Sequence, residues 1–219
     1  MSRLEPASFV ICAGLILALA SLAYSQGGDA ALSAVRDSDR ADRAQKSKQI
    51  NQLPAAEHAR RAGIYLLNRA FAEAREHWQA LIDNYPNDTN VPAALLGIAR
   101  SYYVERRYEE ARQTYESLAR DYPQTKEGRE GLNFSASSLL RMGRGAEAAA
   151  RYQEYLEQYP NGERIDTGHL NIIDGYRESG RPQDAIAWID RTRGRFAGTA
   201  TDSNALFARL RLDIAVGDW

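Results

Sequence analysis

The side chains best suited to acid–base or metal chemistry are few in this 219-residue chain. The three histidines, His58, His77 and His169, do not form the HExxH pattern that binds zinc beside a general base. The only cysteine is Cys12, so a cysteine-based zinc set is not available either. The sequence therefore predicts no metal site, no cofactor and no catalytic residue in the part of the chain given.

Loop signatures of nucleotide and acyl-transfer enzymes are also missing from the sequence. It contains neither a GxSxG nucleophile elbow nor a GxxxxGK[ST] phosphate loop. Four glycines in the second half of the chain fall between expected helices: Gly143, Gly145, Gly162 and Gly180. Turn geometry explains a glycine at each of these positions. By their spacing, His58 and His169 are expected to pack inside, whereas His77 is expected to face outward.

Composition limits the kind of partner. The chain has a net charge of −1, with 44% hydrophobic and 26% charged residues, which is typical of a soluble helical protein. A nucleic-acid partner is not expected, because a strongly basic domain would be needed to bind phosphate.

A period of 37 residues organises the chain. Its markers are Tyr85-Pro86, Tyr122-Pro123, Tyr159-Pro160 and Phe196-Ala197. A fixed period of 20–50 residues indicates stacked repeats. Apolar residues recur three and four apart inside each period, which predicts pairs of amphipathic helices, the first four near 55–68, 71–84, 91–104 and 108–121.

The repeated positions resemble those of the tetratricopeptide repeat. An alanine recurs on the second helix of each pair, at Ala74, Ala111, Ala148 and Ala185. An aromatic residue follows four positions later in three pairs, as Trp78, Tyr115 and Tyr152. The resemblance covers residues 54–219 and implies an all-α right-handed superhelix, or α-solenoid, of antiparallel helix pairs, with repeats at 54–86, 87–123, 124–160 and 161–197.

The two ends of this array depart from the pattern. Arg61 stands where an apolar residue is expected, which suits an opening repeat whose outer side faces solvent. A fifth repeat, 198–219, reaches the turn-like triplet Gly217-Asp218-Trp219 and lacks a second helix. We expect a truncated repeat and a longer parent protein.

The N-terminus is typical of export. Arg3 precedes an apolar run from Phe9 to Leu22, and small residues follow. Residues 1–25 are predicted to be a cleaved signal peptide that directs the chain to the periplasm. The alternative is an inner-membrane anchor at residues 7–24, although the run is short for a spanning helix. Residues 26–53 are predicted to form a polar tether that is partly helical.

The Tyr-Pro joints and the long unit resemble repeats of bacterial envelope proteins. Examples are the Tol-Pal-associated CpoB/YbgF-like proteins, the BamD lipoprotein of outer-membrane assembly, and the helical N-terminal region of soluble lytic murein transglycosylases. The transglycosylases use a Glu-Ser dipeptide, which this chain spells at Glu178-Ser179. Its register places the dipeptide at a turn between helices, so we do not expect it to be catalytic.

The resemblance also implies a binding surface. First helices line the concave face of such arrays, and its groove is expected to bind a protein or peptide through Arg100, Tyr103, Asn133, Asp174 and Arg177. The favoured hypothesis is a non-catalytic scaffold that forms the N-terminal part of a lytic transglycosylase-like protein, with peptidoglycan reached through a downstream domain. The alternative is a stand-alone periplasmic adaptor in envelope or outer-membrane protein assembly. Whether the parent protein is an enzyme is left open by these residues, and membrane contact is expected only through the signal segment.

Overall fold

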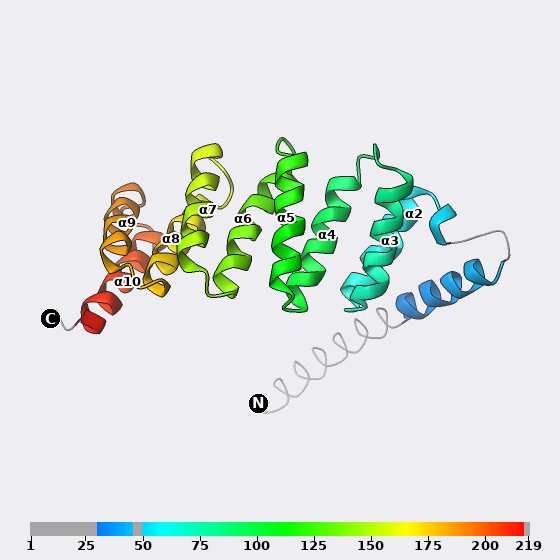
Figure 1. Ribbon diagram of the computed structural model, residues 1–219, viewed down its shortest axis with the longest axis horizontal. Helices are drawn as coiled ribbons and strands as arrows, with labels where there is room; N and C mark the ends of the chain where they lie inside the picture. The colour runs from blue at the N-terminus through cyan, green and yellow to red at the C-terminus, as the bar shows by residue number, and fades with distance from the viewer. Residues whose placement is uncertain (1–29, 46–49, 217–219) are drawn as a thin grey trace, which may run out of the picture. The chain divides into compact units, whose positions relative to one another are not determined.

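The computed structural model describes residues 30–45 and 50–216, and all regular structure within them is helical (Figure 1). None of the helices described in these ranges has the length and apolarity needed to cross a bilayer. The chain divides into two compact units, the first ending at Asn90 and the second beginning at Val91. The expected signal peptide and the final triplet 217–219 lie outside the described residues.

The first unit holds one complete helix pair and an additional helix before it. Residues 30–44 are helical within the stretch expected to be a partly helical tether. A short 3₁₀ turn, η1 (Ile50–Gln52), leads to α2 (Ala55–Leu67) and α3 (Phe71–Asn84). The helices expected near 55–68 and 71–84 therefore form, to within a residue at each end.

The second unit contains three complete pairs and one further helix. Its elements are α4 (Val91–Val104), α5 (Tyr108–Asp121), α6 (Lys126–Arg141), α7 (Gly145–Gln158), α8 (Ile165–Glu178), α9 (Pro182–Arg195) and α10 (Ala200–Val216). The second helices of the four pairs, α3, α5, α7 and α9, are each 14 residues long. Their starts, at residues 71, 108, 145 and 182, follow the period of 37 seen in the sequence.

The turn inside each pair has the same backbone form. A residue with positive φ stands two positions before the second helix begins, and these residues are Arg69 (58°), Arg106 (63°), Gly143 (73°) and Gly180 (70°). Around Gly143, its amide donates to the Leu140 carbonyl at 3.0 Å, and the Arg144 amide donates to the Leu139 carbonyl at 2.9 Å. This left-handed cap satisfies carbonyls that a helix end would otherwise leave unpaired.

The core follows the repeated small and aromatic residues. The four alanines that mark the repeat, Ala74, Ala111, Ala148 and Ala185, are all fully buried. Tyr115 and Tyr152 are buried beside them, at 1% and 0% exposure. A small side chain lets two helices approach closely, and the neighbouring aromatic ring supplies most of the buried apolar surface.

Successive pairs of the second unit approach through glycine. A Cβ on Gly175 of α8 would lie 2.6 Å from the Gly145 carbonyl oxygen of α7, and a Cβ on Gly145 would lie 2.4 Å from the Gly175 oxygen. The expectation that turn geometry explains Gly145 was therefore wrong, because its role is close backbone packing. Gly143 and Gly180 do have the positive φ of a turn, as expected.

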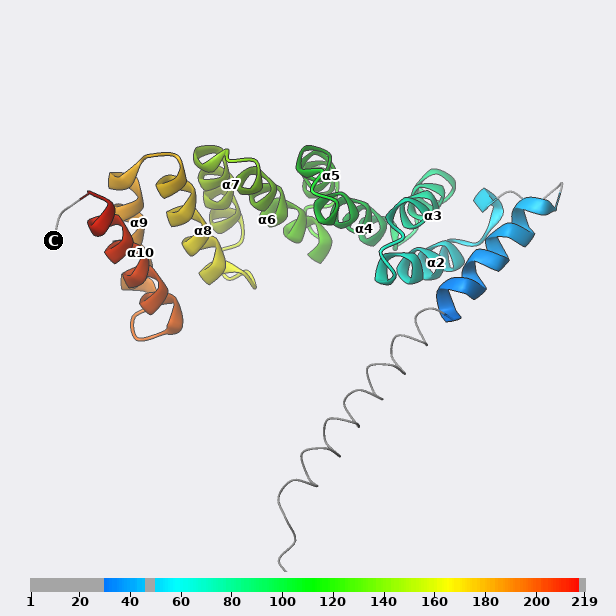
Figure 2. The same cartoon turned by 90° about the horizontal axis from the view of Figure 1, so that it is seen from below.

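The first helices lie on the inner side of the second unit. The backbone of α4 approaches that of α6, and the backbone of α8 approaches those of α6 and α10. Among the described residues, no such close approach of backbones joins α5 to α7 or α7 to α9. Figure 2 shows α4, α6 and α8 along one edge of this unit and α5 and α7 along the other. The array within the unit therefore bends toward its first helices.

Candidate functional site

The predicted binding residues lie on the first helices of the second unit. On α4, Arg100 donates from Nη2 to Oε2 of Glu130 on α6 at 2.6 Å. The Arg100 guanidinium also lies 5.7 Å from the centre of the Phe134 ring, and the Arg164 guanidinium lies 5.1 Å from the same ring. An aromatic ring flanked by two cations and one carboxylate can bind apolar and polar groups of a partner together.

Tyr103 forms a second bridge from α4 to α6. Its hydroxyl lies 3.0 Å from Oγ of Ser137 and accepts a hydrogen bond from Nε of Arg141 at 3.1 Å. The Tyr103 ring also packs edge-on against Tyr108, with ring centres 5.3 Å apart. These contacts hold the Tyr103 ring in one orientation. The entropic cost of ordering this side chain when a partner binds is therefore small.

The other three predicted residues differ in accessibility. Asp174 accepts from Arg177 on the same helix, α8, at 2.9 Å, and both side chains are partly exposed. Asn133 is only 4% exposed, so the expectation that it lines an open groove was wrong. Its Oδ1 atom is enclosed and has no hydrogen-bond partner among the described residues. Asn133 lies beneath the surface formed by its neighbours.

The repeat period places these side chains at equivalent positions. Arg100, Ser137 and Asp174 are 37 residues apart in turn, as are Tyr103, Leu140 and Arg177. Since α4 contacts α6 and α6 contacts α8, the three helices present one continuous face. We call this surface the first-helix face, defined by Arg100, Tyr103, Glu130, Ser137, Asp174 and Arg177. It is polar, carries both signs of charge, and can hydrogen-bond an extended chain or a helix.

The second helices carry a network of ion pairs that sequence reasoning missed. Arg151 of α7 contacts Glu116 of α5 at 3.2 Å and Glu154 at 2.6 Å. Arg112 contacts Glu116 at 2.5 Å and Glu109 at 2.6 Å. A cavity of about 350 Å³ lies among these side chains. Each of these arginines is paired with acids, so the network joins two repeats and leaves little net charge for a ligand.

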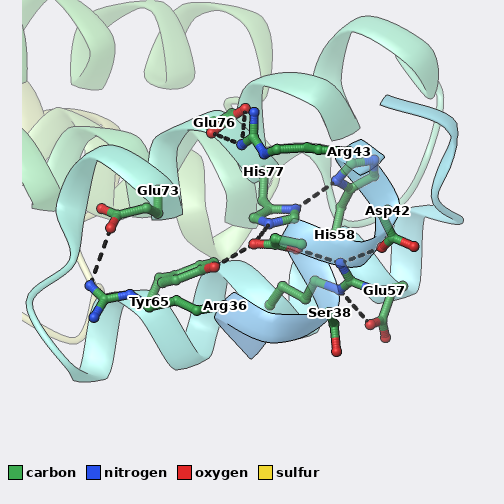
Figure 3. A network of polar contacts seen from close by, with 12 residues as sticks. Arg36, Ser38, Asp42, Arg43, Glu57, His58, Tyr65, Glu73, Glu76 and His77 are labelled. Carbon is green, nitrogen blue, oxygen red and sulfur yellow. Dashed lines mark hydrogen bonds and ion pairs between the residues drawn. The ribbon is translucent and has the colours of Figure 1, made fainter. Parts of the chain in front are cut away.

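A buried polar cluster in the first unit includes His58, Tyr65 and His77 (Figure 3). It centres on Asp39 of the helix at residues 30–44. Its carboxylate accepts hydrogen bonds from Arg61 Nη1 and from the Tyr65 hydroxyl, both on α2. His77 of α3 contacts the same carboxylate through Nε2 at 3.0 Å and reaches His58 through Nδ1 at 3.1 Å. The cluster therefore joins three helices.

Electrostatics fix the charge states in this cluster. Burial alone would raise the pKa of Asp39, but hydrogen bonds from Tyr65, His77 and Arg61 hold it below its usual value. Burial lowers the pKa of His58 to about 4, and the nearby His77 and Arg61 add to that effect. The centre is therefore an ionised carboxylate paired with a guanidinium and flanked by a neutral His58.

The burial of this cluster determines whether a substrate can reach it. An aspartate–histidine chain resembles the acid–base relay of hydrolases, yet both histidine side chains here are fully buried. A substrate cannot reach them, so the arrangement is a structural link. Groups of three or more potential metal ligands do not occur among the residues at 30–45 and 50–216.

Two sequence expectations fail at this cluster for one reason. His77 was expected to face outward, and Arg61 to lie on an exposed outer side, but they are 0% and 6% exposed. The helix at residues 30–44 covers both side chains and supplies Asp39 as their partner. His58 is buried as expected, as is His169, which is 7% exposed.

The Glu-Ser dipeptide lies at the end of α8. Glu178 is the last residue of that helix, and the Ser179 hydroxyl donates to the carbonyls of Gly175 and Tyr176 at 2.8 and 3.1 Å. Gly180 follows in the left-handed conformation. In this position the dipeptide closes the helix.

Several solved structures share the fold. A crystal structure of MamA aligns with a TM-score of 0.54 at 14% identity, over 86% of this chain and 92% of its own. A putative kinesin light chain with TPR-like repeats from Podosopora anserina gives 0.58 at 15% identity, over 80% and 90%. BtubC (BKLC) from P. vanneervenii gives 0.57 at 16% identity, over 98% and 85%. Identities this low show a common fold and leave function open.

Sequence comparison gives the family. No curated protein matches the chain. Models of the tetratricopeptide repeat match residues 60–88 and 93–125, and a second model of the same repeat matches residues 135–200, which together make up more than half of the chain. These matches fall on the helix pairs α2–α3, α4–α5, α6–α7 and α8–α9, whose shared turns and buried alanines are described above. The chain therefore belongs to the tetratricopeptide repeat family.

Proposed function

We propose that this chain is a non-catalytic scaffold that holds a protein partner on its first-helix face. The observation that carries the proposal is the arrangement of α4 and α6, where Arg100, Tyr103 and Glu130 are held in place by contacts between the helices. Fixed polar side chains around an aromatic ring are what a protein ligand needs for orientation and for contact area. Tetratricopeptide repeats generally bind proteins, which agrees with this use.

We place the scaffold in the bacterial cell envelope, exported to the periplasm by residues 1–25. Support comes from the apolar run between Phe9 and Leu22 and from the Tyr-Pro joints between repeats. Within the envelope, a lytic transglycosylase-like parent with peptidoglycan as its substrate is the favoured context. Fusion of the N-terminal 53 residues to a reporter that is active only after export tests the location. A reporter that stays inactive would contradict it.

The binding surface is tested by charge reversal. A photo-reactive residue at position 137 first identifies the partner by crosslinking in cells. The purified partner is then titrated against the Arg100→Glu/Arg177→Glu variant, whose affinity should fall at least about tenfold because two cations on the face are replaced by anions. Calorimetry or anisotropy measures the change.

The matched control is Arg120→Glu/Arg193→Glu, which alters the charge equally on the second helices α5 and α9, at exposed side chains. We expect its affinity to stay within about twofold of the parent chain, since it leaves the first-helix face intact. Equal weakening by both variants would show a general charge effect and would remove the assignment of this face.

A further inference from the structure

Successive first helices of the second unit meet along seams that the repeat makes equivalent. At the seam between α4 and α6, Leu96 and Tyr115 belong to one buried apolar cluster, and Phe134 packs against it. Tyr115 reaches this seam from the second helix α5. The residues 37 positions later are therefore expected to lie together at the seam between α6 and α8. They are Asn133, Tyr152 and Asn171.

The seam between α6 and α8 differs from its neighbours because it is polar. One further step of 37 residues leads to the seam between α8 and α10. It holds Leu170, Ile189 and Ala208, which again belong to or pack against an apolar cluster. The set in the middle instead carries two carboxamides and a hydroxyl. Apolar residues suffice to pack the other two seams, so the polar residues of the middle one need another explanation.

Two polar atoms of this middle seam are buried without a partner. Oδ1 of Asn133 and the hydroxyl oxygen of Tyr152 form no hydrogen bond with any residue in the ranges 30–45 and 50–216. Leaving a buried donor or acceptor unpaired destabilises a fold. The presence of both atoms at one seam is explained if a ligand supplies the missing hydrogen bonds.

The seam lies directly beneath the first-helix face. The Tyr152 hydroxyl is close to Ser137 of α6 and Asn171 of α8, although it forms no hydrogen bond of ordinary geometry with either. Both of these side chains are half-buried, and Ser137 is part of the first-helix face. We expect rotation of the Asn171 side chain to open the seam to a partner. The buried histidines of the first unit, by contrast, lie under a whole helix.

The unpaired atoms define the chemistry of the ligand. Burial raises the pKa of Tyr152, so its hydroxyl keeps the proton and can donate. Oδ1 of Asn133 can only accept. A carboxylate lacks the N–H that Oδ1 needs, and an ammonium group lacks the acceptor that the hydroxyl needs. An amide supplies a carbonyl oxygen and an N–H together, and it brings no charge that would have to be desolvated.

We propose that Asn133, Tyr152 and Asn171 form a subsite that binds one amide group of the protein partner. The Tyr152 hydroxyl donates to the amide oxygen, and Oδ1 of Asn133 accepts from the amide nitrogen. Asn171 provides a further carboxamide at the entrance. This inference rests on the proposed function, because the amide belongs to the partner held on the first-helix face. The amide comes from the partner's backbone or from an Asn or Gln side chain.

Nuclear magnetic resonance on the full chain tests the subsite with small amides as probes. N-methylacetamide represents a peptide backbone, and propionamide represents an Asn or Gln side chain. At least one of them should cause saturable shifts of the α6 and α8 signals next to the seam, and the tighter binder identifies the source of the amide. Methyl acetate has the shape of N-methylacetamide without its N–H. It should bind at least about tenfold more weakly than the preferred amide, because Oδ1 of Asn133 stays unpaired.

The apolar seam provides matched variants. Tyr152→Phe removes the hydroxyl alone, so it should weaken amide binding at least about tenfold without lowering the urea midpoint of the second unit. Tyr115→Phe makes the same change at the apolar seam and should leave amide binding within about twofold of the parent chain. Asn133→Leu/Asn171→Phe installs the residues of the apolar seam and should abolish amide binding.

Four results would overturn the proposal. The first is the absence of saturable shifts with both amides, which would leave the seam as a site for water alone. The second is equal weakening by Tyr152→Phe and Tyr115→Phe. The third is amide binding that survives in Asn133→Leu/Asn171→Phe. The fourth is a lower urea midpoint in Tyr152→Phe than in Tyr115→Phe, which would show that the Tyr152 hydroxyl is already paired.

The proposed function is judged separately from this subsite. Its test replaces Arg100 and Arg177, which leaves the three residues of the seam unchanged. The amide probes do not require either arginine. Failure of the probes to bind would therefore remove the subsite and leave the first-helix face to be decided by charge reversal.

Discussion

At the scale of single residues, Asp39 shows how one buried carboxylate can hold a helix in place. It receives hydrogen bonds from Arg61, Tyr65 and His77, and it is itself only 6% exposed. Burying a charge is unfavourable unless it is paired and hydrogen-bonded, and here both conditions hold. Asp39 thus acts as the link between the helix at residues 30–44 and the pair α2–α3.

Replacing this carboxylate should release the helix. We expect Asp39→Asn to lower the stability of the first unit by about 3 kcal/mol, since it leaves a buried guanidinium without its ionised partner. Urea unfolding followed by Trp78 fluorescence, with Trp188 and Trp219 replaced by Phe, measures the change. Limited trypsin digestion after Arg40 and Arg43 should become faster.

The control for this substitution lies two residues away. Asp37→Asn makes the same chemical change in an exposed pair with Arg40 and should alter stability by less than about 0.5 kcal/mol. Similar losses of stability in the two variants would show that Asp39 stabilises the first unit no more than an exposed ion pair does.

The same cluster predicts sensitivity to acid. His58 has its pKa lowered to about 4 from 6.5, mainly by burial, so the folded state keeps it neutral where the unfolded chain is protonated. Stability is then fully present above pH 6.5 and falls as the pH drops from 6.5 toward 4, by up to roughly 3 kcal/mol. The depressed pKa of Asp39 adds a loss in the same direction at lower pH.

Unfolding free energies of the first unit across this pH range check the prediction. His58→Phe replaces the imidazole with an aromatic ring that cannot be protonated. The unfolding free energy should therefore depend less on pH between 6.5 and 4. An unchanged slope in that variant would mean that another group is responsible.

Sequence reasoning could not find this cluster, and the reason is physical. His58, Arg61 and Tyr65 sit close together on one helix, but His77 and Asp39 come from two others, 38 residues apart in sequence. The repeat period and the spacing of apolar residues specify which face of a helix is buried. They do not specify which neighbouring helix covers it, so Arg61 and His77 were assigned to solvent.

At the scale of elements, the turn between paired helices is built in the same way four times with different residues. The positive-φ position is glycine in two pairs and arginine in the other two. A left-handed backbone costs an ordinary L-residue roughly 1 kcal/mol or more, whereas glycine adopts it freely. Helix boundaries followed from the sequence because these turns, the alanines and Pro182 at the start of α9 are local signals.

Exchanging residue types between two of these turns should change stability in opposite directions. Arg106→Gly is expected to stabilise the second unit by about 1 kcal/mol, and Gly143→Ala to destabilise it by at least about as much. Chemical unfolding followed by helical circular dichroism measures both. A loss of stability in Arg106→Gly would show that the arginine side chain contributes more than its backbone costs.

At the scale of the whole molecule, the repeat determined most of what could be predicted. The all-α class, the period of 37 and the tetratricopeptide family were predicted from the residues and are confirmed by the structure and the family matches. Of the five residues predicted to bind a partner, Arg100, Tyr103, Asp174 and Arg177 lie on the first-helix face, and Asn133 lies beneath it. The partner could not be predicted, since a solenoid offers a similar frame to many ligands.

The repeated turn also bears on how the chain reaches this structure. The hydrogen bonds that close each turn join residues no more than five apart, as between Ala70 and Tyr65 or between Arg181 and Tyr176. Closures of this kind give a low contact order, which favours rapid folding. Folding of a repeat array can begin at any helix pair and then propagate to its neighbours. Adding another 37-residue unit would lengthen such a protein without making its conformational search harder.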